Sequence, residues 1–116
     1  MADRPPTDNR EDAILVLLCT CPEEAQAREI AQRLVEERLA ACVNLVPGVG
    51  SIYRWEGRVE STGEVLLLIK TTARRHDALA QRLAELHPYE VPEILALPVV
   101  EAAAAYAAWV RASCAG

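Results

Sequence analysis

Two cysteines and one histidine are the residues of this chain best suited to binding a soft metal ion. Cys19 and Cys21 form a C-x-C pair at the end of an apolar run, and His87 opens the sequence His-Pro-Tyr-Glu. If the apolar run is a strand, both thiols face the same side of it, because side chains alternate along a strand. Thiolate and imidazole together form a ligand set suited to Cu(I), Zn(II) or Hg(II).

Each of these residues also has a purely structural interpretation. A single cysteine in an apolar strand is usually a small buried side chain, and a histidine at a helix end often satisfies the last carbonyls. Cys21 precedes an expected helix start, where the helix dipole lowers the pKa of a thiol. His87 is held with Tyr89 around a proline. The sequence therefore leaves two roles open for His87, contact with a metal or ligand and capping of the helix end.

The remaining candidate residues favour structural roles. Cys42 begins an expected strand and is interpreted as core, whereas Cys114 lies two residues from the end and is interpreted as incidental. His76, in a first helical turn, is expected to face solvent. Tyr53 and Trp55 would suit stacking on a ligand, but aromatic residues beside an arginine are typical anchors of a subunit interface. We favour the interface.

The elements that must position these residues follow from hydrophobic periodicity and turn signals. Apolar or alternating runs predict four strands, over residues 13–20, 42–55, 64–71 and 92–99. Helical spacing predicts three helices. The first covers residues 22–40, with Thr20 as a cap candidate, and the second is capped by Thr72 and ended by His87-Pro88. The third covers residues 101–114 and buries Tyr106, Trp109 and Val110. Glu56-Gly57-Arg58 supplies a hairpin turn.

This order predicts an α+β fold, a ferredoxin-like β-α-β-β-α-β sandwich with an extra C-terminal helix. In the expected strand order 4-1-3-2, the two thiols, His87 and Tyr89 gather at one end of the sheet. The tip of the second strand points to the same end, and Cys42 and Lys70 fall at the opposite end.

The apolar patterning also predicts an oligomer. Strands one, three and four are apolar on both faces, yet two helices cover only one face of a four-stranded sheet. The other face would expose several hundred Å² of apolar surface, more than monomers usually leave bare. The second strand is a long edge strand, which would promote aggregation unless it is paired.

Composition and missing motifs exclude several classes of protein. The chain has 116 residues and a net charge of −5, which argues against nucleic acid and anionic membranes as partners. Residues 1–12 are expected to be a flexible arm and not a signal peptide, followed by one domain over 13–116. Cytoplasmic, reduced thiols are therefore expected. There is no P-loop, G-x-S-x-G or H-E-x-x-H, and a Cys21–His87 nucleophilic pair would lack an orienting group. We expect no enzymatic activity.

Several stretches in order resemble the CutA divalent-cation-tolerance family over roughly residues 13 to 112. They are Val16-Leu-Leu-Cys-Thr20, Glu37-Arg-Leu-Ala-Ala-Cys-Val43, Ile52-Tyr-Arg-Trp-Glu-Gly57, Glu64 to Thr72, and His87-Pro-Tyr-Glu-Val-Pro-Glu93. The resemblance implies a homotrimer of ferredoxin-like subunits, similar in architecture to the PII signalling proteins, and a link to copper and other divalent cations. It also implies copper contact at Cys19 and His87.

Two positions depart from the family pattern. Leu86 stands where some members have a second histidine, and Cys21 replaces a small or aliphatic residue. Cys21 therefore either substitutes for the missing ligand or is neutral. The leading hypothesis is a cytoplasmic trimer that binds copper or related ions at Cys19, Cys21 and His87 without covalent chemistry. The alternative is a PII-like signalling or scaffold trimer that binds a small molecule or partner in clefts between subunits, where Glu64, Lys70 and the strand-two aromatics matter more.

Overall fold

The fold is that of a computed structural model, which describes residues 10–115. Its elements, in chain order, are η1 (Arg10–Asp12), β1 (Ile14–Cys21), α1 (Glu24–Glu36), β2 (Cys42–Trp55), β3 (Arg58–Thr72), η2 (Ala73–Arg75), α2 (His76–Leu86), β4 (Leu95–Pro98) and α3 (Ala104–Cys114). Of the expected arm, residues 1–9 lie outside the described residues, and the last three form the short helix η1.

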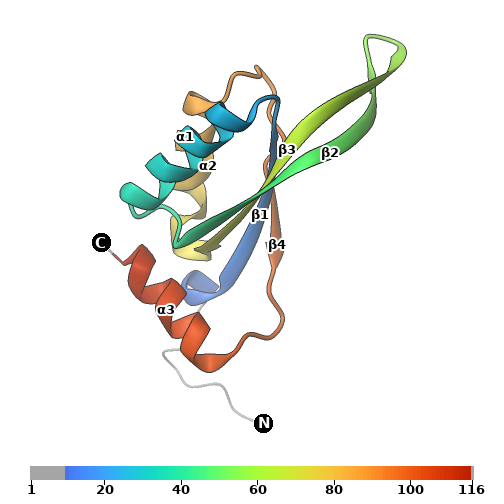
Figure 1. The fold of residues 1–116 in the computed structure, drawn as a ribbon. Coiled ribbons are helices and arrows are strands. Elements are labelled where there is room, and N and C mark those ends of the chain that lie inside the picture. Colours follow the sequence, from blue (N-terminus) through green and yellow to red (C-terminus); the bar gives the residue numbers. More distant parts are fainter. Residues whose placement is uncertain (1–9, 116) are drawn as a thin grey trace.

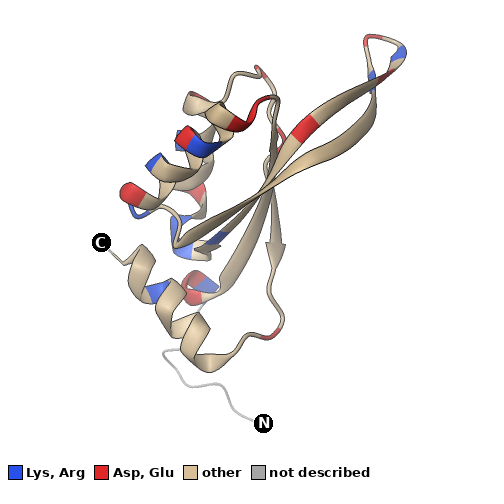
Figure 2. Ribbon diagram, in the orientation of Figure 1, with Lys and Arg blue, Asp and Glu red and all other residues tan. Residues whose placement is uncertain are grey.

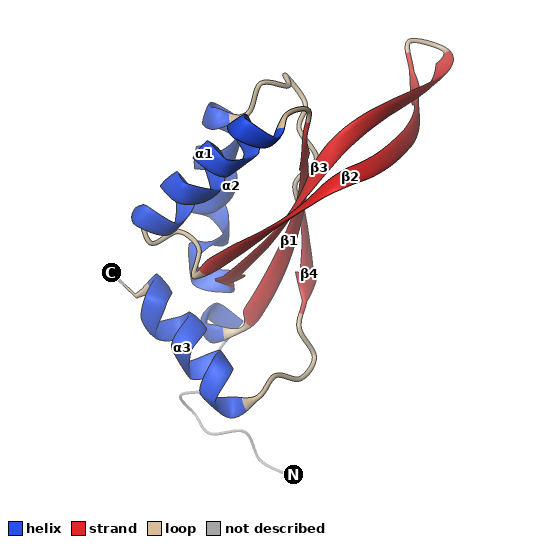
Figure 3. Cartoon of the chain, in the orientation of Figure 1, coloured by secondary structure: helices blue, strands red, loops and turns tan. Residues whose placement is uncertain are grey.

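The four strands form one antiparallel sheet in the order β2-β3-β1-β4, which confirms the predicted α+β ferredoxin-like arrangement. Helices α1 and α2 lie side by side over one face of the sheet, and α3 lies at the end from which β1 starts (Figures 1 and 3). The order places β1 and β3 at the centre and leaves β2 and β4 as edges.

The main core lies between the sheet and α1 and α2. Along β1, Leu17, Cys19 and Cys21 alternate toward the helices and are fully buried. They pair in register with three buried β3 residues, Ile69, Leu67 and Val65. The same cluster includes three α1 side chains at helical spacing and two from α2. These are Ala27, Ile30, Leu34, Leu79 and Leu83.

Helix α1 is shorter at both ends than the predicted range 22–40. Thr20 still belongs to β1, so its expected role as cap was wrong, and Glu23 is the residue before the first turn. At the other end Leu39 N–H donates to Leu34 O and Arg38 N–H to Val35 O, the two bonds of a Schellman motif. Arg38 adopts φ 61°, the left-handed conformation that glycine usually supplies.

Strands β2 and β3 continue past the four-stranded sheet as a two-stranded ribbon, which projects to the upper right of Figure 1. Strand β3 therefore starts at Arg58, six residues before the predicted start. The register shifts between Val46 and Val49, which marks a bulge at Pro47-Gly48. Glu56 and Gly57, both at positive φ, form the expected hairpin turn.

The C-terminal elements differ most from the expectation. Strand β4 pairs with β1 over only four residues, not over 92–99. Helix α3 buries Val110 as predicted, but Tyr106 and Trp109 are 43% and 48% exposed, so their predicted burial was wrong. The helix packs instead through small and medium side chains in a second cluster with the start of β1. That cluster comprises Ile14, Ala41, Ala107, Val110 and Cys114.

The face of the sheet away from α1 and α2 is apolar, as predicted. Leu18 pairs with Leu68 and Leu95, and Val16 pairs with Leu97, so these side chains share that face. None of them falls in the buried class, and Leu95 is 54% exposed. Figure 2 shows charged residues gathered on the helices and the hairpin tip, with the strands of the sheet largely uncharged. We call the face of the sheet that points away from α1 and α2 the open face.

We predict that Arg38→Gly stabilises the fold. A residue with a Cβ costs roughly 1–2 kcal/mol in the left-handed region, whereas glycine costs roughly 0.5–1 kcal/mol in chain entropy. Within residues 10–115, the guanidinium donates a long, exposed hydrogen bond to Ser113 O at 3.4 Å. The free energy of unfolding in urea, at fixed protein concentration, should rise by about 0.5–1 kcal/mol. The matched control Gly57→Ala, at φ 79°, should lower it. A loss of stability in Arg38→Gly would contradict this account.

Candidate metal centre

The candidate donors come from two elements that the fold brings to one end of the sheet. Strand β1 presents Cys19 and Cys21 toward the helices as its last two inward-facing residues. His87 is the residue directly after α2, and its N–H donates to Leu83 O at 2.9 Å. The following Pro88 disfavours helical conformation at His87, which is extended with φ −79° and ψ 141°.

The three donor atoms form a compact, buried cluster. The Sγ atoms of Cys19 and Cys21 and a ring nitrogen of His87 all lie within 4.8 Å of one another. Both cysteines are 0% exposed and His87 is 7% exposed. Within residues 10–115 this is the only group of three or more such donors close enough to share an ion. The structure thus brings together all three residues predicted from the sequence.

The hydrogen bonds of His87 define its ring orientation and tautomer. Nδ1 accepts from the backbone N–H of Tyr89 at 3.0 Å, so it carries no proton. Nε2 lies 2.7 Å from Thr20 O, which can only accept, so Nε2 carries the hydrogen. The same nitrogen is 3.7 Å from Cys21 Sγ. His87 is therefore a neutral imidazole whose Nε2 edge faces the thiols.

The two thiols influence each other's ionisation strongly. A hydrogen bond from Cys19 to Cys21 lowers the pKa of Cys21 and raises that of Cys19, and burial raises the Cys19 pKa further. From the sequence we predicted a lowered pKa for Cys21, with the helix dipole as the cause. The main cause is instead the neighbouring thiol. Cys21 is thus the more easily ionised of the pair and the better nucleophile or metal ligand.

Tyr89 and Glu64 border the cluster. The Tyr89 ring packs against the His87 ring with centroids 4.9 Å apart, and its hydroxyl donates to Glu64 Oε2 at 2.9 Å. Burial and this carboxylate raise the pKa of Tyr89 to about 12, so the hydroxyl remains a donor. The sequence pointed to both residues as candidates but did not predict the contact between them. The only signal was a lone carboxylate at the start of the apolar run Glu64 to Ile69.

Strand geometry favours two free thiols over a disulfide between them. Two residues along an antiparallel strand span about 6.8 Å, at the upper limit of the Cα separations that disulfides tolerate, roughly 4.4–6.8 Å. Pairing with β3 holds Cys19 and Cys21 in this extended form. Both are free cysteines in the structure. The pair is therefore arranged to present two sulfurs to a common neighbour.

The donor set fits a soft metal ion. Donors about 2.3 Å (sulfur) and 2.1 Å (nitrogen) from a tetrahedral ion lie about 3.6 Å apart, and Cys21 Sγ and His87 Nε2 are 3.7 Å apart. For Nε2 to bind an ion, its hydrogen would have to leave Thr20 O, and a neutral ring would carry that hydrogen on Nδ1, at the cost of the bond from Tyr89 N–H as well. Leu86, at the position of the absent second histidine, packs against the core and offers no donor.

The other candidates lie away from this cluster. Cys42 and Lys70 face each other at the opposite end of the sheet, as predicted, with Nζ 3.9 Å from Sγ. Cys42 is only half-buried and not the core residue expected. Cys114, interpreted as incidental, is instead buried beside Thr71 Oγ1 at 3.7 Å.

Two further expectations concern exposed side chains. His76, expected to face solvent, is partly covered, and its Nδ1 lies 3.0 Å from Asp77 Oδ1. Tyr53 and Trp55 are 40% and 57% exposed on the ribbon, so nothing within the described chain anchors them in a core.

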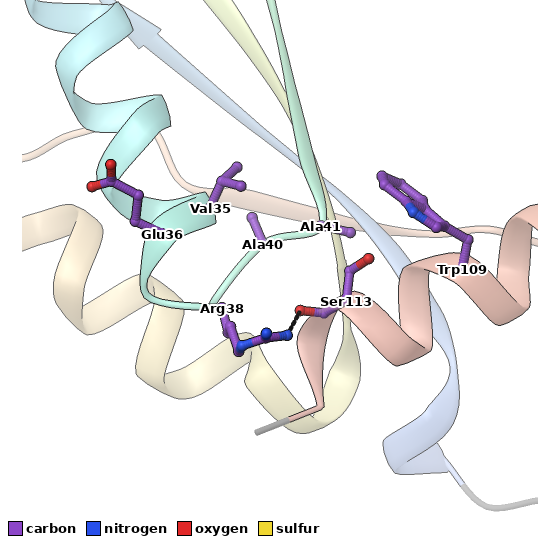
Figure 4. A pocket seen from close by; sticks show the side chains of 7 residues that line it. All are labelled: Val35, Glu36, Arg38, Ala40, Ala41, Trp109 and Ser113. Atoms are coloured by element: carbon purple, nitrogen blue, oxygen red, sulfur yellow. Dashed lines mark hydrogen bonds between the residues drawn. The ribbon is translucent and has the colours of Figure 1, made fainter.

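Two shallow hollows of the described chain lie away from the donors. One of about 300 Å³ lies between the end of α1 and α3, lined by Val35, Trp109 and the Arg38–Ser113 contact (Figure 4). Another of about 310 Å³ lies between α1 and β2. Both are shallow and open. The donor cluster is a closed cluster of side chains and not a ligand pocket.

Fold and donor cluster together define a small ferredoxin-like protein with two thiols and an imidazole buried at one end of its sheet. Comparison with known sequences identifies the family of the protein. The sequence model described as CutA1 divalent ion tolerance protein matches residues 15–113. The chain therefore belongs to the CutA1 family, as the resemblance implied.

Individual relatives agree with this assignment. The divalent-cation tolerance protein CutA of Thermus thermophilus is 56% identical over 96 residues, which are 83% of this chain and 93% of that protein. The crystal structure of CutA from Xylella fastidiosa superposes with a TM-score of 0.87 at 42% identity, covering 89% of this chain and 99% of that one. A structure from Archaeoglobus fulgidus, described as a periplasmic divalent cation tolerance protein CutA, has a TM-score of 0.85 at 29% identity, over 88% and 99% of the two chains.

We predict that Cys19 and Cys21 react with iodoacetamide only after unfolding. Both side chains are fully buried, whereas Cys42 is half-buried. Mass spectrometry of peptides from folded protein should show neither residue labelled, and labelling in denaturant without a reductant should modify both. The second step distinguishes protected thiols from a disulfide. Rapid labelling of either residue in the folded state would contradict the described burial.

Proposed function

We propose that this chain contributes to divalent-cation tolerance by binding copper, or a related soft metal ion, at Cys19, Cys21 and His87. The observation that carries the proposal is the cluster of three buried donors within 4.8 Å. Two buried thiols and an imidazole suit soft ions. Family membership supports the link to cations, because the relatives carry divalent-cation tolerance in their names.

The same geometry argues that the site binds without catalysing a reaction. A histidine that activates a cysteine must accept its proton, but His87 Nε2 already carries a hydrogen donated to Thr20 O. Its other nitrogen is occupied by the Tyr89 N–H. A bound ion would supply Lewis acidity, while the chain supplies two sulfurs, one nitrogen and a site from which water is largely excluded. We propose a binding protein and not an enzyme.

We further propose that the protein is a homotrimer. The open face and the exposed ribbon both leave apolar surface uncovered in a single chain, including Ile52 at 75% and Val59 at 67% exposure. The unpaired edges of β2 and β4 provide backbone donors and acceptors that suit strand pairing between subunits. These features support association, and the number three rests on the resemblance to the family.

We place the protein in the cytoplasm, with metal ions and its own subunits as partners and without nucleic acid or membrane binding. Four free cysteines suit a reducing compartment, and the net charge of −5 disfavours polyanions. Across residues 10–115, no helix is both long enough and apolar enough to cross a bilayer. Because the Archaeoglobus relative is described as periplasmic, fractionation of cells that express the full chain is the direct measurement.

The metal-binding proposal predicts that removal of the donors abolishes tight binding. Cu(I), supplied under reducing conditions in competition with a chromophoric chelator, should bind the wild type with a dissociation constant below micromolar. Cys19→Ala/His87→Ala should weaken binding by about 100-fold or more, beyond the roughly 10–100-fold typical of residues that only orient ligands. Cys21→Ala tests whether the third donor substitutes for the absent histidine.

Cys42→Ala is the matched control for that experiment. It removes a half-buried thiol at the far end of the sheet and should leave Cu(I) affinity unchanged. Equal affinity, weaker than micromolar, in wild type and double variant would refute the proposed function. A loss in Cys42→Ala equal to that in Cys21→Ala would show that binding is not confined to the cluster.

The assembly proposal predicts that charge on the open face dissociates the protein. Leu68 lies on β3 between Leu18 and Asn44 on that face, so Leu68→Lys would bury an unpaired charge in an interface. Multi-angle light scattering should give three chain masses for the wild type and a smaller species for Leu68→Lys. Val35→Lys, at a 40% exposed site on α1, is the control and should leave the mass unchanged. A monomeric wild type would overturn this proposal.

A second function is favoured by the shallowness of the hollows in a single chain. Two hollows in the described residues are open and lie away from the donors, which favours a small-molecule site formed between subunits. In that case the protein is a PII-like signalling or scaffold trimer, with Glu64, Lys70, Tyr53 and Trp55 more important than Cys19. Co-crystallisation of a Cys19→Ala/Cys21→Ala variant that still shows an organic ligand between subunits would favour it.

A further inference from the structure

Both ring nitrogens of His87 already take part in hydrogen bonds in the folded chain. Nδ1 accepts from the backbone N–H of Tyr89 at 3.0 Å, and Nε2–H donates to Thr20 O at 2.7 Å. For Nε2 to become a ligand, its hydrogen must leave, and both bonds are lost if the neutral ring then carries that hydrogen on Nδ1. Breaking hydrogen bonds in a largely buried region costs free energy. The fold therefore holds His87 in the form that donates a hydrogen bond, and not in the form that binds an ion.

The two sulfurs are not constrained in this way. The thiol hydrogen of Cys19 has two weak acceptors, the Cys21 sulfur and Thr20 O at 3.8 Å. Cys21 Sγ lies 3.7 Å from His87 Nε2, which donates a hydrogen. Thiols are weak donors and weak acceptors, so little hydrogen bonding is lost when they give up their protons. The cysteines are therefore the ligands that the folded chain can offer with the least disruption.

The spacing of the two sulfurs suits an ion that lies between them. Cys19 and Cys21 leave β1 on the same side, and pairing with β3 holds that part of the strand extended. Their Sγ atoms lie within 4.8 Å of each other. Two metal–sulfur bonds of about 2.3 Å, the length found for zinc, span about 4.6 Å when placed end to end. An ion between the two sulfurs is thus within bonding reach of both.

A site of two buried sulfurs selects among soft ions by coordination number. Cu(I) and Hg(II) are soft ions that accept two thiolates in line, whereas Zn(II) in structural sites is almost always four-coordinate. Within residues 10–115 the donor cluster includes no carboxylate. Both cysteines are 0% exposed, so solvent does not supply the missing ligands. The cluster therefore favours a two-coordinate ion over zinc.

The N–H of His87 suits a role beside the bound ion. Each thiol releases its proton when it binds a metal, so Cu(I) with two thiolates carries one net negative charge. A buried charge costs free energy unless hydrogen bonds compensate it. Nε2–H lies between Thr20 O and Cys21 Sγ, at 2.7 Å and 3.7 Å, and a hydrogen bond to an ionised acceptor is stronger than one to a neutral acceptor. The imidazole can therefore stabilise the Cys21 thiolate without losing its hydrogen.

We propose that Cys19 and Cys21 alone are the ligands, in a two-coordinate site for Cu(I) or Hg(II), and that His87 remains a hydrogen-bond donor beside the ion. The inference rests on the proposed function and divides its three residues into two ligands and one positioning residue. Cys21 thereby takes the place of a histidine ligand as the partner of Cys19.

X-ray absorption of the Cu(I)-loaded wild type measures the ligands directly and needs no variant. Copper supplied below one equivalent per chain, with a phosphine reductant, should show two sulfur neighbours and no imidazole nitrogen. Nitrogen-15 NMR should show the Nε2–H form of His87 both before and after loading, with the other histidine, His76, as the reference. A copper–nitrogen bond, or loss of the Nε2 hydrogen on loading, would overturn the inference.

Three variants separate the ligands from the donor. Cys19→Ala and Cys21→Ala each leave a single sulfur, so each should weaken Cu(I) binding by about 100-fold or more, whereas residues that only orient ligands contribute roughly 10–100-fold. His87→Gln keeps a side-chain N–H but has no imidazole, and it should weaken binding by about 10-fold at most. If His87→Gln loses as much affinity as Cys21→Ala, His87 is a ligand and the inference is wrong.

Zinc is the control ion for this site. Because two sulfurs fill only half of its usual shell, Zn(II) should bind much more weakly than Cu(I), and Cys21→Ala should leave its affinity unchanged. Tight Zn(II) binding that His87→Gln abolishes would contradict the two-sulfur site. Tight Cu(I) binding with a nitrogen ligand would refute this inference and leave the proposed function standing, whereas a wild type that binds no Cu(I) would refute both.

Discussion

The pairing of β1 with β3 is the constraint on which the rest of the structure depends. Its eight residue pairs run without a bulge from Ile14–Thr72 to Cys21–Val65. This register places both thiols and the large apolar side chains of β3 on the helix side, and Leu18 and Leu68 on the open face. A slip by one residue would exchange the two faces of one strand, moving the thiols out of the core. Core, donor cluster and open face are thus set by a single register.

His87 shows how a local backbone preference is converted into a long-range contact. Pro88 keeps His87 out of the helical conformation, so the side chain leaves α2 toward the end of β1, where Thr20 O and Cys21 Sγ meet it. Every buried polar side-chain atom in the described residues has a partner. The site is therefore formed, with its hydrogen bonds satisfied, before any cation is present. An ion at Nε2 would cost the bond to Thr20 O and, with the hydrogen moved to Nδ1, the bond from Tyr89 N–H.

The sequence predicted the strand order, the facing of Cys19 and Cys21 and their proximity to His87, because period-two alternation and crossover rules determine all three. It did not predict the end of α1, since a left-handed Arg38 carries none of the glycine signal that usually marks a Schellman motif. The exposure of Tyr106 and Trp109 was missed because alanines surround both, so periodicity could not say which face of α3 packs. The Tyr89–Glu64 bond was missed because contacts between side chains 25 residues apart depend on how a loop crosses the sheet end.

The bulge in β2 shifts the phase of the strand. Before it, Val43 and Leu45 share the helix side with Ile69 and Leu67; after it, the pairs Tyr53–Glu60 and Trp55–Arg58 follow the alternation of Leu66 and Leu68. One extra residue thus transfers the odd-numbered side chains of β2 from one side to the other. The aromatic pair thereby follows the side of the open face along the ribbon, beside Glu60 and Arg58, instead of the helix side. A single inserted residue thus divides β2 into two parts, of which the part before the bulge packs in the core and the part after it presents an outward aromatic surface.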